Sequence, residues 1–524
     1  KGYAAVVGEY VYSSSYDIGE GWGSTDIFPC CGLSRTLTNM NVYTGGPQNN
    51  VMFTVSAVGN ALHPRNLYAM FYSDTLFKHD MSFFAYKRDT IRNISLSKLL
   101  SPVNLPVTIN GDGADSTDRI VVAGFSVTYP ATWNFNNEKN FYFELKDNTA
   151  GNYLVINNFN AGGVAPVLYD YNTAKRYLGD ISVPGQVRFV LPASTDTLRR
   201  FNLMSQQTSN VNLVTSMTSH SFTDFSKPAQ QGDYLIISNP VLYNDGSGNN
   251  YVDKYAQYRA SVNGGSFNAK VFDISELTEQ FGFGIRKHPS AVRDFVRYAT
   301  ANFAPAPKYL FIIGRGINYD EYTSYQPTYP QTDQENLVQT FGYPASDILL
   351  TSAPGTLIPL VPVGRLGAIT GAEVGNYYRK MVEYEQVQRS PGHTVADKAW
   401  MKNFLFTIGP GDSLEAIDFK QKMAYYQTIV EDTLTGGHVE TFTKTGVSAI
   451  EQQQSQRIDE LFHEGLTYVK YFGHSSANEL GINLNYPENY QNAGKYPFMQ
   501  VSGCTVGNFY TFNIARVNGY NGMS

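Results

Sequence analysis

Short alternating runs of hydrophobic and polar residues dominate the first 230 residues of the chain. Apolar side chains recur at every second position over much of segments such as 50–59, 119–130, 152–160 and 185–192, and Asn, Gly, Asp and Pro lie between these segments. A period of two residues is typical of β-strands with one buried face. Many short strands at this spacing predict an antiparallel β-sandwich, jelly-roll-like in character, or more than one such β-domain.

Residues 129–145, YPATWNFNNEKNFYFEL, concentrate aromatic side chains within this β-rich region. Aromatic residues in a sandwich most often belong to its hydrophobic core. A face that stacks against glycans is the alternative, and the pattern alone does not exclude it.

The pattern changes near residues 226–240, where strands begin to alternate with helices. Near-continuous apolar segments are separated by amphipathic segments of helical length; the apolar segments include 233–238, 269–273, 308–313, 403–409, 466–473 and 496–502. Strands without polar alternation are buried on both faces, which predicts a mostly parallel sheet covered by helices. We therefore divide the chain into a β-rich region, 1–230, and an α/β domain, 231–524.

Composition narrows the class of protein. Charged residues make up 16% of the 524 residues, against roughly 25% in ordinary globular proteins, and the abundance of Tyr, Asn, Ser, Thr and Gly is typical of secreted β-rich proteins. The net charge of −6 gives no basic field, which argues against nucleic acid as a partner. No window reaches the ~18–20 apolar residues that cross a bilayer.

Both ends of the chain look like cuts. The first residues, KGYAAVVGEYVY, contain neither an initiator Met nor the apolar stretch of a signal peptide. The last residues, NIARVNGYNGMS, follow soon after an apolar strand without a capping element. We expect a chain that was processed or is a fragment.

The chain has three cysteines, and two of them, Cys30 and Cys31, are adjacent. Pairing these two would close a strained eight-membered ring, so the sequence predicts no disulfide framework. Cys504 is left over. Such a residue is either a small buried hydrophobic side chain or a reactive thiol.

Cys504 and His474 both follow the end of a predicted strand. His474 comes after LTYVKYFG and Cys504 after PFMQVSG. In open α/β sheets, ligands collect beyond the carboxyl ends of the strands, so neighbouring strands would bring imidazole and thiol to the same edge. An imidazole increases the thiolate fraction and supplies a proton to a leaving amine. We predict that Cys504 is a nucleophile and His474 its general acid and base.

Small residues flank this pair. Gly473 and Gly503 allow close approach of a peptide backbone and tight turns whose amides can point toward an oxyanion. The backbone amides of Cys504 and of Gly473 or Ser475 are therefore the candidate oxyanion donors.

A third group is expected to orient the imidazole, and the end of the strand at 403–409 offers one. We predict Asp412 for this role, with Glu415 and Asp418 behind it, by the logic of catalytic triads. An Asp just before a helix is also a common N-cap, so both interpretations stay open.

The remaining histidines have no spacing that indicates a metal site; they are His63, His79, His220, His288, His393, His438 and His463. We expect surface or packing roles for them. The predicted chemistry requires no cofactor. A structural calcium ion stays open, although no sequence pattern indicates one.

Two blocks of the α/β domain resemble a known family. The segments YVKYFGHSS and GKYPFMQVSGCTVGNFYTF resemble the His and Cys blocks of the gingipain-type cysteine peptidases, and IPLVPVGRLGAITGAEVGNYYRKMVEYE resembles a strand and helix of that family. The resemblance spans about residues 233–524. The residues of the His and Cys blocks, together with the β-rich first half, are most similar to those of the PorU-type sortases of the type IX secretion system.

This resemblance implies a caspase-like α/β fold and a Cys504–His474 dyad. It implies removal of C-terminal sorting domains from protein cargo, with other type IX secretion components as partners, at the outer-membrane surface of a Bacteroidota-type bacterium. Capture of the acyl-enzyme by an amine of lipopolysaccharide stays open. The chain departs from the gingipains at Ser475, where they carry Gly, and it stops twenty residues after Cys504, before the family's domain is complete.

Two other functions remain open. One is a secreted gingipain-like protease of broad specificity, because a β-rich proregion could resemble the first half of this chain. The other is a noncatalytic surface subunit for binding or assembly that keeps the fold. The specificity pocket depends on loops that the sequence does not place.

Overall fold

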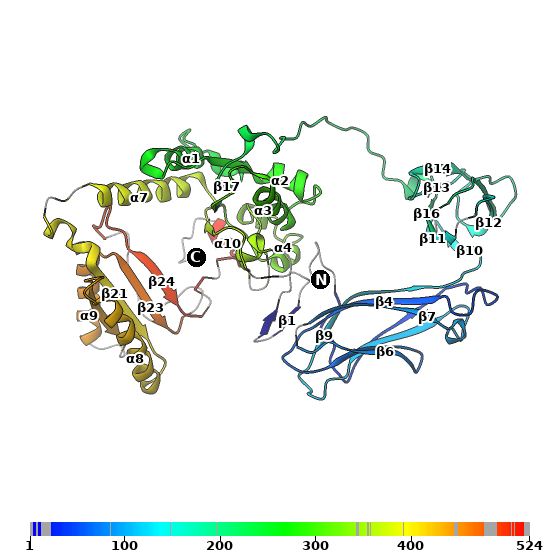
Figure 1. Cartoon of the computed structure of the whole chain (residues 1–524), viewed down its shortest axis with the longest axis horizontal. Helices are drawn as coiled ribbons and strands as arrows, with labels where there is room; N and C mark the ends of the chain where they lie inside the picture. The colour runs from blue at the N-terminus through cyan, green and yellow to red at the C-terminus, as the bar shows by residue number, and fades with distance from the viewer. Residues whose placement is uncertain are drawn as a thin grey trace. The chain divides into compact units, whose positions relative to one another are not determined.

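The computed structural model describes residues 4–6, 9–11 and 23–517, with gaps at 84, 147, 196–197, 342–344, 354–355, 357, 391, 393, 445–448, 476–489, 505 and 508. The chain forms two compact units, one of residues 1–16 and 21–221 and one of residues 17–20 and 222–524. The first unit is built from strands and the second from strands and helices (Figure 1).

The first unit contains a β-sandwich close to its N-terminal end. Its strands are β3 (Leu33–Leu37), β4 (Val51–Gly59), β5 (Asn66–Phe71), β6 (Asp74–Asp80), β7 (Tyr86–Ile94), β8 (Leu105–Gly111) and β9 (Ile120–Thr128), with a short helix η1 (Leu96–Lys98). They form the antiparallel sheets β3-β8-β5-β6 and β7-β4-β9. On β4, Val51, Phe53 and Val55 are fully buried and the residues between them are not. The period of two therefore produces the core. Separately, β1 (Ala4–Val6) pairs antiparallel with β2 (Glu9–Val11).

A second sandwich follows within the same unit. Its strands are β10 (Asn134–Glu138), β11 (Asn140–Lys146), β12 (Asn152–Phe159), β13 (Val167–Asp170), β14 (Lys175–Leu178), β15 (Gln186–Leu191) and β16 (Leu198–Met204), followed by η2 (Thr208–Asn210). They form the sheets β10-β12-β15 and β11-β16-β13-β14. The prediction of an all-β first region is confirmed, and the region holds two sandwiches.

The aromatic run at 129–145 lies mainly in the core of this second sandwich. The rings of Phe135 and Phe141 stack with centroids 3.8 Å apart, and Phe143 packs on Phe201. Trp133 contacts the same cluster. The core interpretation is therefore confirmed for these residues, whereas Tyr142 between them points outward and is exposed.

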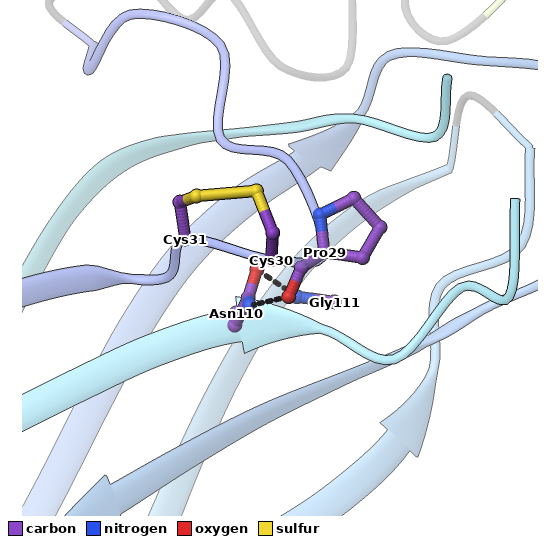
Figure 2. The surroundings of a disulfide bond; sticks show 5 residues. All are labelled: Pro29, Cys30, Cys31, Asn110 and Gly111. Carbon is purple, nitrogen blue, oxygen red and sulfur yellow. Dashed lines mark hydrogen bonds between the residues drawn. A yellow bond between two sulfur atoms is a disulfide. The ribbon is translucent and has the colours of Figure 1, made fainter. Parts of the chain in front are cut away.

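Cys30 and Cys31 form a disulfide in the loop before β3 (Figure 2). The expectation that ring strain would keep them apart was wrong. Their Cα atoms are 3.8 Å apart, and the loop is held from the neighbouring strand because Asn110 Nδ2 donates to the carbonyl of Pro29 at 2.8 Å. Of the cysteines in the described chain, Cys504 is the free one.

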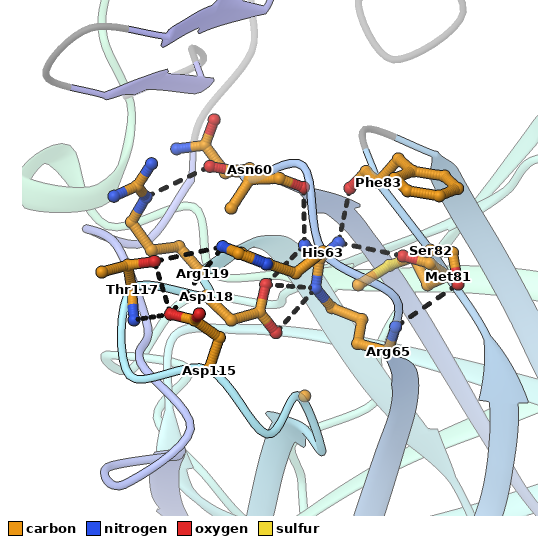
Figure 3. A network of polar contacts seen from close by, with 12 residues as sticks. Asn60, His63, Arg65, Met81, Ser82, Phe83, Asp115, Thr117, Asp118 and Arg119 are labelled. Atoms are coloured by element: carbon orange, nitrogen blue, oxygen red, sulfur yellow. Dashed lines mark hydrogen bonds and ion pairs between the residues drawn. The ribbon is translucent and has the colours of Figure 1, made fainter.

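A buried ion pair fixes loops of the first sandwich (Figure 3). Arg65 Nε donates to both carboxylate oxygens of Asp118, at 2.7 and 2.9 Å. Its remaining nitrogens donate to the carbonyls of Met81 and Ala61. A buried charge is tolerated when it is paired and fully hydrogen-bonded. This arginine therefore has a structural role.

The second unit begins with a four-stranded parallel sheet, in the order β18-β17-β19-β20. Its strands are β17 (Tyr234–Ser238), β18 (Ala269–Asp273), β19 (Tyr309–Ile313) and β20 (Val363–Leu366). The helices α1 (Tyr251–Ala260) and α7 (Gly371–Arg389) cover one face, and α2 (Ile274–Phe281) and α3 (Ser290–Asn302) pack beside β18 through contacts such as Phe272 with Phe295. Short helices fill the connections: η3 (Pro228–Gln230), η4 (Pro240–Tyr243), η5 (Val262–Gly264), α4 (Tyr319–Tyr325), α5 (Thr332–Glu335), α6 (Ile348–Thr351) and η6 (Ala396–Lys402).

A second parallel sheet follows, in the order β22-β21-β23-β24. Its strands are β21 (Asn403–Gly409), β22 (His438–Thr443), β23 (Tyr468–Gly473) and β24 (Phe498–Ser502). Helix α9 (Ala449–Glu464) packs on one face and α8 (Ser413–Val430) on the other, and α10 (Ile514–Val517) comes last. The predicted parallel strands with helices on both faces are confirmed, but they form two sheets where the sequence pattern predicted one. None of the helices in the described ranges has the length and hydropathy to cross a membrane.

Candidate active site

Two neighbouring strands carry the predicted dyad to one edge of the second sheet. β23 and β24 pair in parallel with Phe472 opposite Ser502. His474 directly follows β23, and Cys504 stands two residues after the end of β24. The register therefore brings both residues to the carboxyl edge of adjacent strands, and the Cys504 side of that edge is exposed to solvent.

Three glycines let the strand ends converge at this edge. A Cβ on Gly473 would lie 2.4 Å from the carbonyl oxygen of Gly409, and a Cβ on Gly503 would lie 2.1 Å from the hydroxyl of Ser475. The neighbours of Gly473 are backbone atoms, so only glycine fits there, whereas a side chain at Gly503 would displace the Ser475 hydroxyl. The amide of His474 also donates to the carbonyl of Gly409 at 2.8 Å. The backbone thus holds the imidazole at the end of β21.

A carboxylate contacts the imidazole directly. Glu415 Oε2 lies 2.9 Å from Nε2 of His474 and accepts a hydrogen bond from the amide of Gly411 at 2.8 Å. The side chains of His474 and Glu415 are 61% and 38% exposed. The bonds from Gly411 and then from His474 lower the pKa of Glu415 below its usual value. A carboxylate that stays ionised can orient the imidazole and stabilise its protonated form.

Asp412 has a different position from the one expected of an orienting acid. Its Oδ1 accepts hydrogen bonds from the amides of Leu414 and Glu415, at 2.8 and 2.9 Å, as the N-cap of α8. The carboxylate on His474 is that of Glu415. Asp412 contributes by starting the helix whose first turn carries Glu415, while the salt bridge of Asp418 is with Lys422.

Ser475 links the two loops of the site. Its hydroxyl donates to the carbonyl oxygen of Cys504 at 2.9 Å. The hydroxyl therefore ties the backbone of the thiol loop to the backbone of the histidine loop, a contact that glycine at this position could not make. The oxyanion roles of the amides of Gly473, Ser475 and Cys504 stay a prediction.

Several of the other histidines of the described chain bond to groups outside this edge. His79 bonds to Asp89, His63 to Thr117, and buried His288 to Ser290. His393 lies outside the described residues. Within the described ranges, His, Cys, Asp and Glu side chains form no group of three or more that could hold a metal ion.

Residues 227–518 match the sequence model of a family described as Peptidase family C25. This match covers more than half of the chain and includes both His474 and Cys504. The chain belongs to peptidase family C25. It is therefore a member of the gingipain-type cysteine peptidases, as the resemblance of the His and Cys blocks implied.

Solved structures similar to this C25 chain include dimeric latent PorU from Porphyromonas gingivalis, at 15% identity over 78% of this chain and 42% of PorU, with a TM-score of 0.43. The Arg-specific cysteine proteinase gingipain R (RgpB) is also 15% identical, over 53% of this chain and 56% of that chain, with a TM-score of 0.37. The chain thus spans less than two thirds of either protein. No curated protein matches it. The family assignment rests on the family match alone.

Proposed function

We propose that this C25 chain is a cysteine endopeptidase that acts as a sortase of type IX secretion, cleaving C-terminal sorting domains from secreted cargo. One observation supports this chemistry. His474 directly follows β23 and contacts Glu415, and Cys504 follows the neighbouring strand β24 at the same edge of the sheet. The β-rich first unit favours the sortase role over a free digestive protease, because a digestive enzyme needs no such module.

The residues divide the chemistry among themselves. The thiol of Cys504 gives its proton to His474, and the sulfur attacks the carbonyl carbon of the scissile peptide bond. His474 then returns the proton to the leaving amine, which leaves the cargo as a thioester on Cys504. Because Glu415 occupies Nε2, Nδ1 is the ring nitrogen that exchanges the proton. Water releases the cargo, or an amine of surface lipopolysaccharide captures it in a transpeptidation.

The wider setting follows from the same proposal. The α/β unit is a caspase-like peptidase domain, with the amides of Gly473, Ser475 and Cys504 as the oxyanion donors. The protein works on the outer-membrane surface of a Bacteroidota-type bacterium beside other type IX secretion components. Neither a metal nor a cofactor enters these steps.

A pair of substrates tests the sortase role. The protein is incubated with a denatured generic protein and with a cargo that carries its C-terminal sorting domain, and cleavage products are identified by mass spectrometry. We expect one cut at the sorting-domain junction and slow attack on the generic protein, with both lost in Cys504→Ala. Rapid degradation of the generic protein would instead indicate a protease of broad specificity.

A thiol-directed electrophile tests whether the chain is an enzyme at all. We expect Cys504 to react faster in the folded protein than in urea, and His474→Ala to remove that advantage. Equal rates in the folded and unfolded protein would favour the noncatalytic binding or assembly subunit.

A further inference from the structure

Residues 510–516, which come soon after Cys504 in the sequence, lie at the carboxyl ends of the first sheet. Residues 510–516 make polar contacts with the loops and helices there through both backbone and side-chain atoms; these contacts are Asn318 with the Tyr510 carbonyl, Arg315 with the Thr511 carbonyl, Glu321 with the Phe512 amide, Glu335 with the Asn513 amide, and Glu373 with Arg516. We name residues 510–516 the strap. The strap ties the loop of the thiol to the sheet that does not carry the dyad.

Tyr510 is the strap residue nearest to Cys504 among these contacts, and its side chain enters a buried charged cluster. Its hydroxyl donates to Asp347 Oδ2 at 2.9 Å, and its ring lies 5.8 Å from the guanidinium carbon of Arg365. Arg365 in turn donates from Nε and Nη2 to the two oxygens of Asp347, each at 2.8 Å. Tyr510 is 8% exposed.

The buried charges of Asp347 and Arg365 compensate each other. Burial alone would raise the pKa of Asp347, but the charge and hydrogen bonds of Arg365 outweigh burial and lower it. Arg365 also donates to the carbonyls of Gly314 and Val338, so its guanidinium is fixed to the backbone beyond β19. A paired and bonded cluster of this kind is rigid, because any displacement would leave a buried charge unsatisfied.

We propose that Tyr510, with Asp347 and Arg365, is a positioning anchor that holds the Cys504 loop in its reactive place. Five residues separate Cys504 from Tyr510, and β24 fixes the other end of the loop at Ser502. The loop is therefore short and closed at both ends. This inference rests on the proposed role of Cys504 as nucleophile.

The test compares two tyrosine variants. Tyr510→Phe removes the hydroxyl that bonds Asp347 and keeps the ring over Arg365. Tyr322→Phe is the matched control, because the hydroxyl of Tyr322 donates to Asp333 at 2.8 Å in the same unit but outside the strap. Three quantities are measured for each variant and for the wild type: the melting temperature, kcat and KM on the cargo substrate, and the rate at which iodoacetamide labels Cys504 in the folded protein.

We expect Tyr510→Phe to lower kcat and the labelling rate by about tenfold, with KM little changed. Displacing a catalytic group by about 1 Å costs roughly 100-fold in rate. The effect should be smaller here because the backbone contacts of the strap still hold the Cys504 loop. Tyr322→Phe should lower the melting temperature by a similar amount and leave both rates at the wild-type value. A general loss of stability cannot produce this difference between the two variants.

Two outcomes overturn the proposal, and they are distinguishable. If wild-type Cys504 is labelled no faster than an unfolded cysteine, the thiol is not activated and the proposed function itself fails. If the wild type is activated but Tyr510→Phe and Tyr322→Phe give equal rates, the proposed function stands and the anchor is wrong.

Discussion

The two parallel sheets of the second unit share one topology but differ in the exposure of their strand ends. Both use the strand order in which the first strand lies between the second and the third, with the fourth at the edge. In each, a glycine ends or directly follows the third and the fourth strand: Gly314 and Gly367 in the first sheet, Gly473 and Gly503 in the second. The residues after these glycines are Arg315 and Ala368 in one sheet, and His474 and Cys504 in the other.

The difference lies in what covers the strand ends. Arg315 is 1% exposed beside Glu335, at 3.3 Å, and its amide bonds to the carbonyl of Ala368. His474 is 61% exposed beside Glu415. A buried arginine and carboxylate form a structural ion pair. An imidazole and a carboxylate that are exposed to solvent can exchange protons with a substrate. The same backbone thus supports a scaffold in one sheet and a reactive edge in the other.

The largest effect is expected at the reactive edge itself. Cys504→Ala should abolish cleavage, because no other group at the edge can form the thioester. Since the thiol is exposed, the melting temperature should stay at the wild-type value. Residual turnover above one part in about a thousand, measured on the cargo substrate, would mean that the reactive edge lies elsewhere, because covalent catalysis cannot survive loss of its nucleophile.

His474→Ala should come next. General acid and base catalysis is worth about 10²–10⁴-fold, so we expect kcat/KM to fall within that range with the fold intact. His438→Ala is the control, because His438 is an exposed residue at the start of β22 in the same sheet. An equal loss in both variants would contradict the role of His474.

The scaffold edge should respond mainly in stability, with a smaller effect on chemistry because Arg315 and Glu335 also contact the strap. Arg315→Met leaves Glu335 buried without its cation, which costs about 3–5 kcal/mol of unfolding free energy, measured by urea denaturation. The double variant Arg315→Met/Glu335→Gln should recover part of this loss. Arg457→Met, at a more exposed cluster of pairs, should cost less than about 1 kcal/mol; an equal cost would contradict a buried ion pair at the first sheet.

The same variant has a pH dependence of definite sign. Burial raises the pKa of Glu335 above its usual value even with Arg315 in place. Removing the cation raises it further, so the folded state binds a proton more readily than the unfolded state. The unfolding free energy of Arg315→Met should therefore increase as the pH falls from 8 to 5. A decrease over this range would contradict the assignment.

The smallest effect is expected for Glu415→Gln. Glutamine can still bond to His474 but carries no charge, and cysteine peptidases depend less on the orienting acid than serine peptidases do, so we expect about a tenfold loss in kcat. Because bonds lower the pKa of Glu415, the stability difference from the wild type should be full at pH 7 and shrink as the pH falls below 4.5. Asp412→Asn, which can retain the cap, should change kcat less.

The strands and the two ends that carry the dyad could be predicted from the sequence, because hydrophobic period and strand ends are local signals. Glu415 could not be selected over Asp412, because the choice depends on the geometry of the start of α8. One signal was available: in Asp412-Ser-Leu-Glu415 the acid three residues after an N-cap reaches back toward the cap. In this conformation the side chain of Glu415 lies at the end of β21, and its carboxylate contacts His474.

Other features depend on contacts that no local pattern encodes. The position of the loop that carries Cys30 and Cys31 depends on a bond from Asn110 on β8 to the carbonyl of Pro29. The division of the β-rich region into two sandwiches depends on strand partners that lie far apart in sequence, such as β3 with β8.

The bond between Tyr510 and Asp347 joins residues 163 positions apart, and this separation sets a time order. Closing such a long loop is slow and requires both partners to exist. During synthesis from the N-terminus, every strand of both sheets precedes Tyr510. The Cys504 loop therefore cannot be held at Tyr510 until the strands of both sheets have been synthesised and Asp347 is in place. Until then the loop is not positioned for reaction.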